Sequence, residues 1–220
     1  MEKPKKRHLP RSTEAPRPGE IARAGGRTLT SYRVAALPII NHLLERMRLD
    51  TFFRSYFPRA DRRCRIAPSI GISLLLKNVL LAREPLYGIG EWAARFDPKA
   101  LGFTDDQLPS LNDDRVGRCL DCLFRTDITS MVLALATHVV QEFQVDLDEL
   151  HNDSTTITFH GEYADAAREQ KRGKQTRMAI TWGHNKDHRP DLKQLLFILT
   201  VARDGAVPLY FQVEIGRAHV

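Results

Sequence analysis

The 220-residue sequence is poor in the features that define several classes of protein. It contains only three cysteines, too few for a small secreted fold held by disulfides, so we expect reduced thiols and a cytoplasmic protein. Its longest apolar runs, Met131–Ala136 and Leu195–Ala202, are far shorter than the roughly 18 residues of a membrane span, which argues against a membrane partner. No apolar segment follows the basic N-terminus, so we expect no secretory signal peptide.

Positive charge is concentrated at the N-terminus. Residues 1–30 contain eight Lys and Arg side chains and three Glu, so this segment carries +5 of the total charge of +6. Its four prolines and scarcity of large apolar residues predict a disordered basic tail over residues 1–33. A mobile basic arm is suited to nucleic-acid phosphates, while a solubilising tail is the alternative. The candidate DNA contacts in this tail are Lys3, Lys5, Lys6 and Arg7.

The segment from residue 34 to residue 143 has the three-to-four-residue apolar spacing of helices. We expect five or six helices, which is the size of a small all-α domain. Pro38 is suited to a first helical turn, whereas Asn112 and Asp127 are suited to N-caps. In the helix after Asn112, the predicted inward face consists of Val116, Cys119, Leu120 and Leu123.

The periodicity changes at Gln144, where β-branched residues and alternation predict a strand ending near Phe159. Residues 160–190 are polar, without a clear period, and predict a long loop. Two apolar runs then follow, at Gln194–Arg203 and Val207–Glu214, and the Asp204-Gly205 pair between them predicts a hairpin. The expected fold class is therefore α+β, with an all-α domain at 34–143 followed by the first strands of a second domain at 144–214.

Two motifs resemble metal sites. Cys119 and Cys122 form a CxxC, but a zinc site needs further ligands and only Cys64 remains, so packing in the core is the favoured interpretation. His184 and His188 have the spacing of two ligands on one helical turn, but Gly183 and Pro190 make a helix there doubtful.

The segment that holds these histidines is also rich in hydrogen-bond donors for phosphate. A solvated loop is the equally weighted alternative. The candidate nucleic-acid contacts in this segment are Lys186, His188, Arg189 and Lys193.

Asp153 is the strongest candidate for catalysis. It lies in a run suited to an interior strand, where an unpaired charge is costly. Carboxylates that project from a sheet can hold the divalent cations of phosphoryl transfer, although a capping or turn aspartate is the commoner explanation from spacing alone.

Two long motifs resemble one known family. Residues 150–163 read LHNDSTTITFHGEY, and residues 183–213 read GHNKDHRPDLKQLLFILTVARDGAVPLYFQV. Together they resemble the DDE transposases of bacterial insertion sequences, in the branch related to retroviral integrases and ribonuclease H. The similarity extends from about Leu37 to Gln212, and its N-terminal helical part is often described only as a domain of unknown function.

The resemblance implies a ribonuclease H-like α/β domain that begins at residue 144. It also implies metal-dependent cleavage and transfer of DNA strands with Mg²⁺ or Mn²⁺. Asp153 matches the first member of the Asp-Asp-Glu triad and would be both a catalytic residue and a metal ligand. The second aspartate and the glutamate have no counterpart in these 220 residues, so we expect an inactive N-terminal fragment that binds no metal tightly.

The last six residues, 215–220, depart from the family pattern and match the translation of a common sequencing adapter, so we expect a non-native tail. The expected partners are the DNA ends of the element and, through self-association, a second copy of the chain. The alternative function is a non-enzymatic DNA-binding or assembly module derived from a transposase, and a helical protein-interaction module is a further rival.

Overall fold

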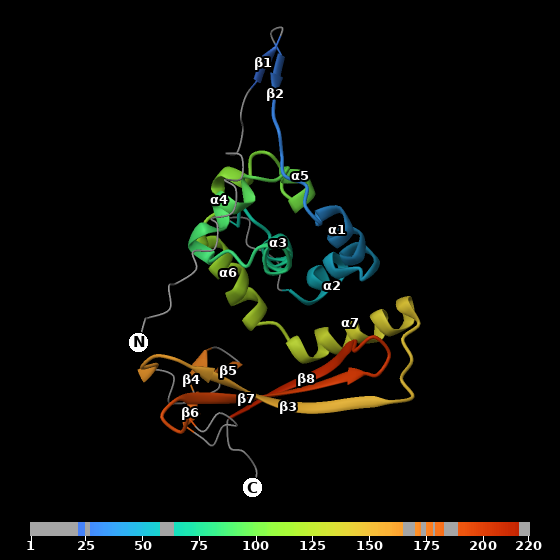
Figure 1. Ribbon diagram of the computed structural model, residues 1–220. Helices are drawn as coiled ribbons and strands as arrows, with labels where there is room; N and C mark the ends of the chain where they lie inside the picture. The colour runs from blue at the N-terminus through green and yellow to red at the C-terminus, as the bar shows by residue number, and fades with distance from the viewer. Residues whose placement is uncertain are drawn as a thin grey trace, which may run out of the picture.

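The computed structural model describes residues 22–24, 27–57, 64–164, 170–172, 175–177, 179–182 and 189–215. It is an α+β fold, with seven α-helices in the N-terminal part followed by an antiparallel sheet (Figure 1). This agrees with the fold class expected from the sequence. In the described part of the chain, no helix has both the length and the apolar character needed to cross a membrane.

The helical part contains seven α-helices and two short 3₁₀ helices among the described residues. The α-helices are α1 (Leu37–Arg46), α2 (Leu49–Tyr56), α3 (Pro68–Leu81), α4 (Ile89–Ala93), α5 (Pro98–Leu101), α6 (Asp113–Phe124) and α7 (Ile128–Phe143). The 3₁₀ helices are η1 (Leu86–Gly88) and η2 (Leu108–Ser110).

Local capping chemistry explains where the longer helices begin. Pro38 lies in the first turn of α1, where its missing N–H costs nothing. The side chain of Asn112 accepts a hydrogen bond from the backbone N–H of Arg115, and that of Asp127 accepts one from Ser130. The predicted helix starts are therefore confirmed at all three positions.

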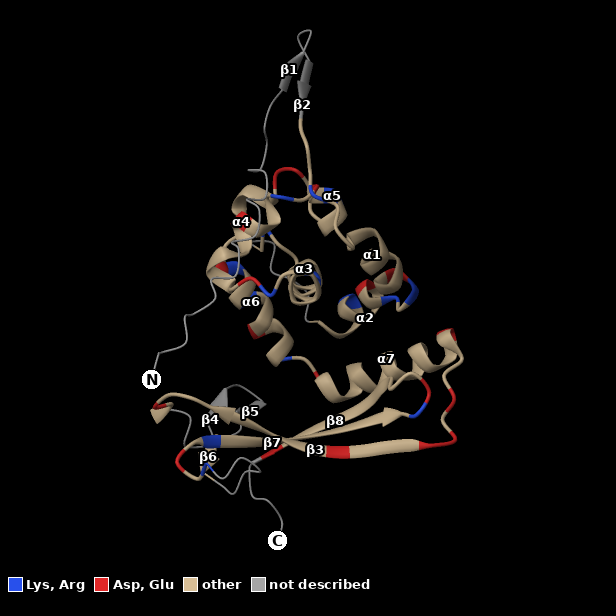
Figure 2. Ribbon diagram, viewed as in Figure 1, with Lys and Arg blue, Asp and Glu red and all other residues tan. Residues whose placement is uncertain are grey.

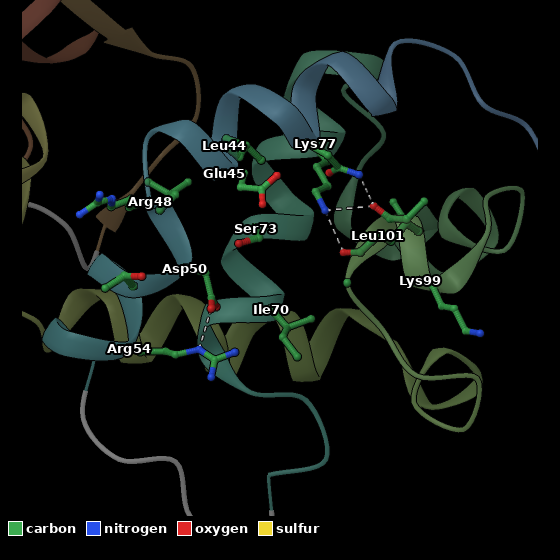
Figure 3. A pocket seen from close by; sticks show the side chains of 15 residues that line it. Leu44, Glu45, Arg48, Asp50, Arg54, Ile70, Ser73, Lys77, Lys99 and Leu101 are labelled. Carbon is green, nitrogen blue, oxygen red and sulfur yellow. Dashed lines mark hydrogen bonds and ion pairs between the residues drawn. The ribbon is translucent and has the colours of Figure 1, made fainter. Parts of the chain in front are cut away.

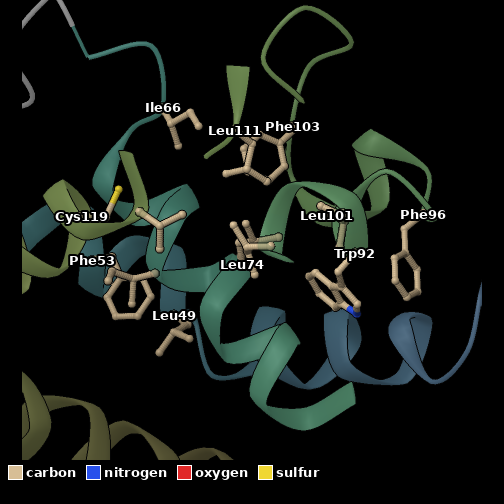
Figure 4. Packing of buried hydrophobic residues seen from close by; sticks show 14 of the residues in the cluster. Leu49, Phe53, Ile66, Leu74, Trp92, Phe96, Leu101, Phe103, Leu111 and Cys119 are labelled. Carbon is tan, nitrogen blue, oxygen red and sulfur yellow. The ribbon is translucent and has the colours of Figure 1, made fainter. Parts of the chain in front are cut away.

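The main hydrophobic core lies around α3, which passes through the middle of the helical part (Figure 4). Leu74 of α3 is fully buried, and aromatic side chains such as Phe53, Trp92 and Phe96 pack in the same cluster. Leu101 of the short helix α5 is also fully buried, although the sequence pattern did not predict that helix. The core thus combines residues from most of the helical elements.

Helix α6 turns most of its predicted inward face to this core. Val116 and Cys119 are buried and Leu123 packs against the core, as expected. Leu120, however, is 38% exposed, and Cys122 is buried instead. Positions 119 and 122 are one helical turn apart, so the buried stripe runs through the two small thiols.

Gly71 allows α3 and α6 to pack at very short range. A Cβ atom added at Gly71 would collide with the Sγ of Cys119 and would lie 3.0 Å from its Cβ. Glycine is therefore required by the neighbouring helix and not by the conformation of its own backbone. In contrast, a Cβ at Gly117 of α6 would meet nothing within 4 Å.

The main sheet has β7 (Lys193–Ala202) at its centre, with β3 (Leu150–Phe159) on one side. On the other side β7 pairs with β8 (Pro208–Ile215) and, at its first two residues, with β6 (Thr181–Trp182). All of these pairs are antiparallel. The predicted hairpin is confirmed, and the turn between β7 and β8 carries positive φ angles at Gly205 and Ala206. The predicted strand ends at Phe159 as expected but begins only at Leu150, several residues after Gln144.

Two short ribbons lie in segments where the sequence predicted no strands. Strands β4 (Gln170–Arg172) and β5 (Gln175–Arg177) pair within the expected loop. Strands β1 (Ala22–Ala24) and β2 (Arg27–Leu29) pair within the expected disordered tail and project beyond the helices (Figure 1). Residues 1–21 of that tail and residues 216–220 of the expected non-native tail lie outside the described residues, while Ile215 pairs with Leu195 in β8.

Helix α7 connects the two parts of the molecule, because it contacts both α2 and strand β8 (Figure 1). At its C-terminal half, Glu142 pairs with Arg46 of α1 at 3.0 Å, and Arg46 also lies over the ring of Phe143. The ring of His138 lies against Phe52, and its Nε2 donates to the carbonyl oxygen of Arg46 at 3.0 Å. These contacts fix α7, and with it the sheet, to the helices.

The contact between α3 and α6 predicts that Gly71→Ala destabilises the protein. The clash with Cys119 should cost about 1–3 kcal/mol of the free energy of unfolding, as overpacking usually does. Gly117→Ala is the matched control and should gain up to about 1 kcal/mol, because alanine favours a helix and the space is open. Urea denaturation measures both. Equal stability of the two variants would contradict the close packing.

The edge of β3 predicts that the full chain self-associates. In the described residues β3 pairs with β7 alone, so its other edge presents unpaired backbone groups. Ile157 is 42% exposed on this strand, and Ile157→Lys should shift the chain toward the monomer in sedimentation velocity experiments. Leu133→Lys, at an exposed site on α7, is the control that should leave the association unchanged. A monomeric wild-type chain would contradict this prediction.

Candidate functional site

Asp153 lies on β3, the outer strand of the sheet, opposite Leu199 of β7. The sequence places it there because β-branched residues follow it and favour an extended backbone. Its side chain is exposed, and its Oδ1 accepts a hydrogen bond from the backbone N–H of Ser154 at 2.8 Å. Within the described part of the chain, no ion pair involves this carboxylate.

The two faces of β3 differ in exposure. Thr155 and Ile157, which share a face with Asp153, are exposed. Ser154, Thr156 and Thr158 on the other face are half-buried. The carboxylate is therefore presented to solvent from a strand whose register is fixed by pairing along all of its ten residues.

A single carboxylate does not make a two-metal site. Mg²⁺ takes near-octahedral oxygen ligands, and protein sites supply at least one or two carboxylates together with substrate oxygens. Among the described residues, no group of three or more His, Cys, Asp or Glu side chains is arranged to hold a metal ion. The residues present beside Asp153 do not fit a complete two-metal centre.

A second group of acidic residues surrounds the turn between β7 and β8. Asp146, Asp148, Glu149 and Asp204 line a hollow of about 600 Å³ together with Arg203 and Gly205. Arg203 pairs with Glu149 at 2.6 Å, and the Oδ2 of Asp204 accepts from the backbone N–H of Asp146 at 3.1 Å. These contacts tie the segment before β3 to the turn, so their role is to hold the sheet together.

Only two of the predicted nucleic-acid contacts lie in the described part of the chain. Lys3, Lys5, Lys6, Arg7, Lys186 and His188 lie outside it, as does His184 of the doubtful zinc motif. Arg189 is exposed, and its guanidinium forms two hydrogen bonds with Asp191, at 2.8 and 2.7 Å. This pairing raises the pKa of Arg189 and lowers the pKa of Asp191, so much of the positive charge is already neutralised locally.

Lys193 does not have the exposed position that the phosphate-binding prediction requires. It is buried at the start of β7, where its ammonium donates to the carbonyl oxygens of Glu162 and Tyr163 at 2.8 and 2.7 Å. The same nitrogen lies 4.9 Å from the ring centroid of Trp182. The physical reason is tertiary, because the chain after β3 folds back over the lysine and satisfies its charge.

The cysteines behave as core residues. All three are free thiols, and Cys119 and Cys122 are buried, whereas Cys64 is exposed. Burial raises the pKa of Cys119 to about 11, and its thiol donates to the carbonyl oxygen of Arg115 at 3.3 Å. Burial also raises the pKa of Cys122. Thiols held protonated in this way are poor nucleophiles and poor metal ligands, which agrees with the packing interpretation.

Comparison with known proteins finds similarity to one family. No curated protein and no solved structure matched the chain. Residues 29–137 match the family described as Domain of unknown function (DUF4277). The match begins at the last residue of β2 and ends within α7, so it covers the helical core and leaves out the sheet that carries Asp153. Residues 29–137 of the helical part are thus similar to this family.

Proposed function

We propose that this chain is the N-terminal part of a DDE transposase of an insertion sequence. In this proposal the basic N-terminal segment and the helical part bind the DNA ends of the element. Asp153 supplies the first of three carboxylates of the catalytic centre, and the protein acts in the cytoplasm. The exposed carboxylate of Asp153, on a strand that directly follows the helical domain, is the observation that carries the proposal.

The surroundings of Asp153 support a role beyond folding. A carboxylate that stabilises its own fold is normally engaged by a cation or by a helix N-terminus. Asp153 instead accepts a hydrogen bond from the N–H of the next residue and otherwise faces solvent. It stands on a regular strand, so its position is set by the ladder with β7 and not by a loop. Such a carboxylate is available to a ligand that approaches the sheet from outside.

The distribution of charge supports DNA as the partner. Figure 2 shows Lys and Arg (blue) and Asp and Glu (red) spread together over the helical part. Arg46, Arg54 and Arg118 each pair with a carboxylate within 3.0 Å, so their charges are partly neutralised. The N-terminal segment has few acidic residues to pair with its eight basic ones. Its phosphate contacts would release counterions and give affinity without reading sequence.

The alternative is a DNA-binding or assembly module without catalysis. It is favoured by the finding that the described residues supply no complete metal centre. DNA binding is common to both forms of the proposal, and cleavage by the longer reading frame that contains these 220 residues distinguishes them. A helical protein-interaction module, the remaining rival, would bind no DNA.

Cleavage assays test whether these 220 residues are sufficient for catalysis. The 220-residue chain should not nick element-end DNA with Mg²⁺ or Mn²⁺, because one carboxylate cannot hold the two ions of the reaction. Asp153→Asn should also show no nicking. Its stability should equal that of the wild type, since substitutions at exposed positions usually change the free energy of unfolding by less than about 0.5 kcal/mol. Metal-dependent nicking that disappears in Asp153→Asn would show that the chain is a complete enzyme.

Salt-dependent binding tests the DNA partner. Replacing Lys5 and Lys6 by glutamine should flatten the slope of log K against log salt by about two units, because each phosphate contact contributes about 0.9. The matched control replaces Arg118 and Arg203, which are ion-paired in the structure, and should leave the slope nearly unchanged. Fluorescence anisotropy with a short duplex measures both variants. Equal slopes for all three proteins, or no DNA binding at all, would contradict the proposed DNA contact.

A further inference from the structure

A separate cavity of about 530 Å³ lies in the helical domain, between α1, α2, α3 and α5 (Figure 3). Its size is within the range of small-molecule sites. Apolar side chains such as Leu44, Leu49 and Ile70 form part of its wall. The polar and charged residues include Ser73 and Lys77 of α3 and Glu45 of α1, so the cavity offers both an apolar lining and a few fixed polar groups.

Lys77 is the buried charge of this cavity. Its side chain is 6% exposed, and its Nζ donates to the carbonyl oxygens of Ala100 and Leu101 at 3.2 and 3.1 Å. The carbonyl oxygen of Ala100 also accepts from the Nδ2 of Asn41 at 2.8 Å. These contacts orient the ammonium at the end of α5 and use two of its three donors.

The ammonium of Lys77 lacks a counter-ion among the described residues. Glu45 and Asp50 line the same cavity, but neither forms an ion pair with Lys77. Asp50 pairs instead with Arg54 at 2.7 Å. Burial without an opposite charge lowers the pKa of Lys77 to about 8. An anion in the cavity would offset this cost, because an opposite charge favours the protonated lysine.

Basic residues outnumber unpaired acids around the cavity. Arg48 and Lys99 lie on opposite sides of it with their charged ends turned outward, and Lys77, Ser73 and Glu45 lie between them (Figure 3). Because Arg54 and Asp50 neutralise each other, the remaining lining has three cations and one carboxylate. The net positive charge of the lining favours an anionic ligand. The carboxylate of Glu45 can accept a hydrogen bond from a donor group on the same ligand.

We infer that this cavity binds a small organic anion whose carboxylate or phosphate oxygen accepts the third N–H of Lys77. The carbon body of the ligand would contact Leu44, Leu49 and Ile70, and a donor group on it would face Glu45. This site is separate from Asp153 and from the basic N-terminal segment. It gives the helical part a ligand of its own.

The test uses the full chain and two probes, inorganic phosphate and acetate, each titrated at constant ionic strength. The NMR signal of the Lys77 side chain, assigned by its loss in Lys77→Arg, should shift saturably with at least one probe. The pKa of Lys77, followed by the same signal, should rise when the probe is bound. A response to phosphate alone or to acetate alone identifies the class of anion, and a response to both supports a general oxyanion site.

Variants separate this site from non-specific binding. The bound probe should raise the melting temperature of the wild type. Lys77→Met should need about tenfold or more probe for the same rise, because it loses a charged hydrogen bond to the probe. Arg118→Met, which removes a charge outside the cavity, should respond like the wild type. No saturable shift of Lys77 with either probe, or equal responses of Lys77→Met and wild type, would overturn the inference. If Lys77→Met fails to fold, the wild-type signal alone decides.

Discussion

Helix α3 can occupy the centre of the helical domain because Gly71 lets α6 approach it closely. A Cβ atom at this position would collide with the side chain of Cys119, so either that side chain or α6 would have to shift. With α6 in place, Leu74 becomes fully buried and the aromatic side chains of the neighbouring elements close around it. Interiors of this density tolerate little change in volume, so this single contact sets the positions of several helices.

The same scaffold positions the sheet. Helix α7 ends the helical part, but it also packs against β8, and its contacts with Arg46 fix it to α1. His138 donates to the C-terminal carbonyl of α1, where a hydrogen bond satisfies one of the groups that a helix end leaves open. The strand with Asp153 is therefore held in a defined position relative to the helical part, although β3 lies at the edge of the sheet opposite β8 (Figure 1).

Much of the fold could be predicted from local sequence signals. Pro38, Asn112 and Asp127 marked helix starts because capping depends on a few adjacent residues, and Asp204-Gly205 marked the hairpin for the same reason. The missed features depend on residues far apart in the chain. Leu120 is exposed because α6 is oriented with Cys119 against Gly71 of α3.

The candidate sites show the same division. The strand that carries Asp153 could be predicted from its β-branched residues. The burial of Lys193 could not, because it depends on the chain near Glu162 folding over the lysine. Lys77 carried no local signal at all, because its partners at residues 100 and 101 belong to a helix too short to predict. The spacing of residues along the sequence does not show which distant carbonyl groups will accept hydrogen bonds from a buried lysine.

The catalytic assignment of Asp153 can be tested most directly by an excision assay in cells. The longest reading frame that contains these 220 residues would be expressed beside a marked copy of its element, as wild type, Asp153→Asn and Asp148→Asn. Asp148 is an exposed acid just before β3 and serves as the control. The account predicts that excision is lost in Asp153→Asn and retained in Asp148→Asn. Excision at the wild-type level in Asp153→Asn would contradict it.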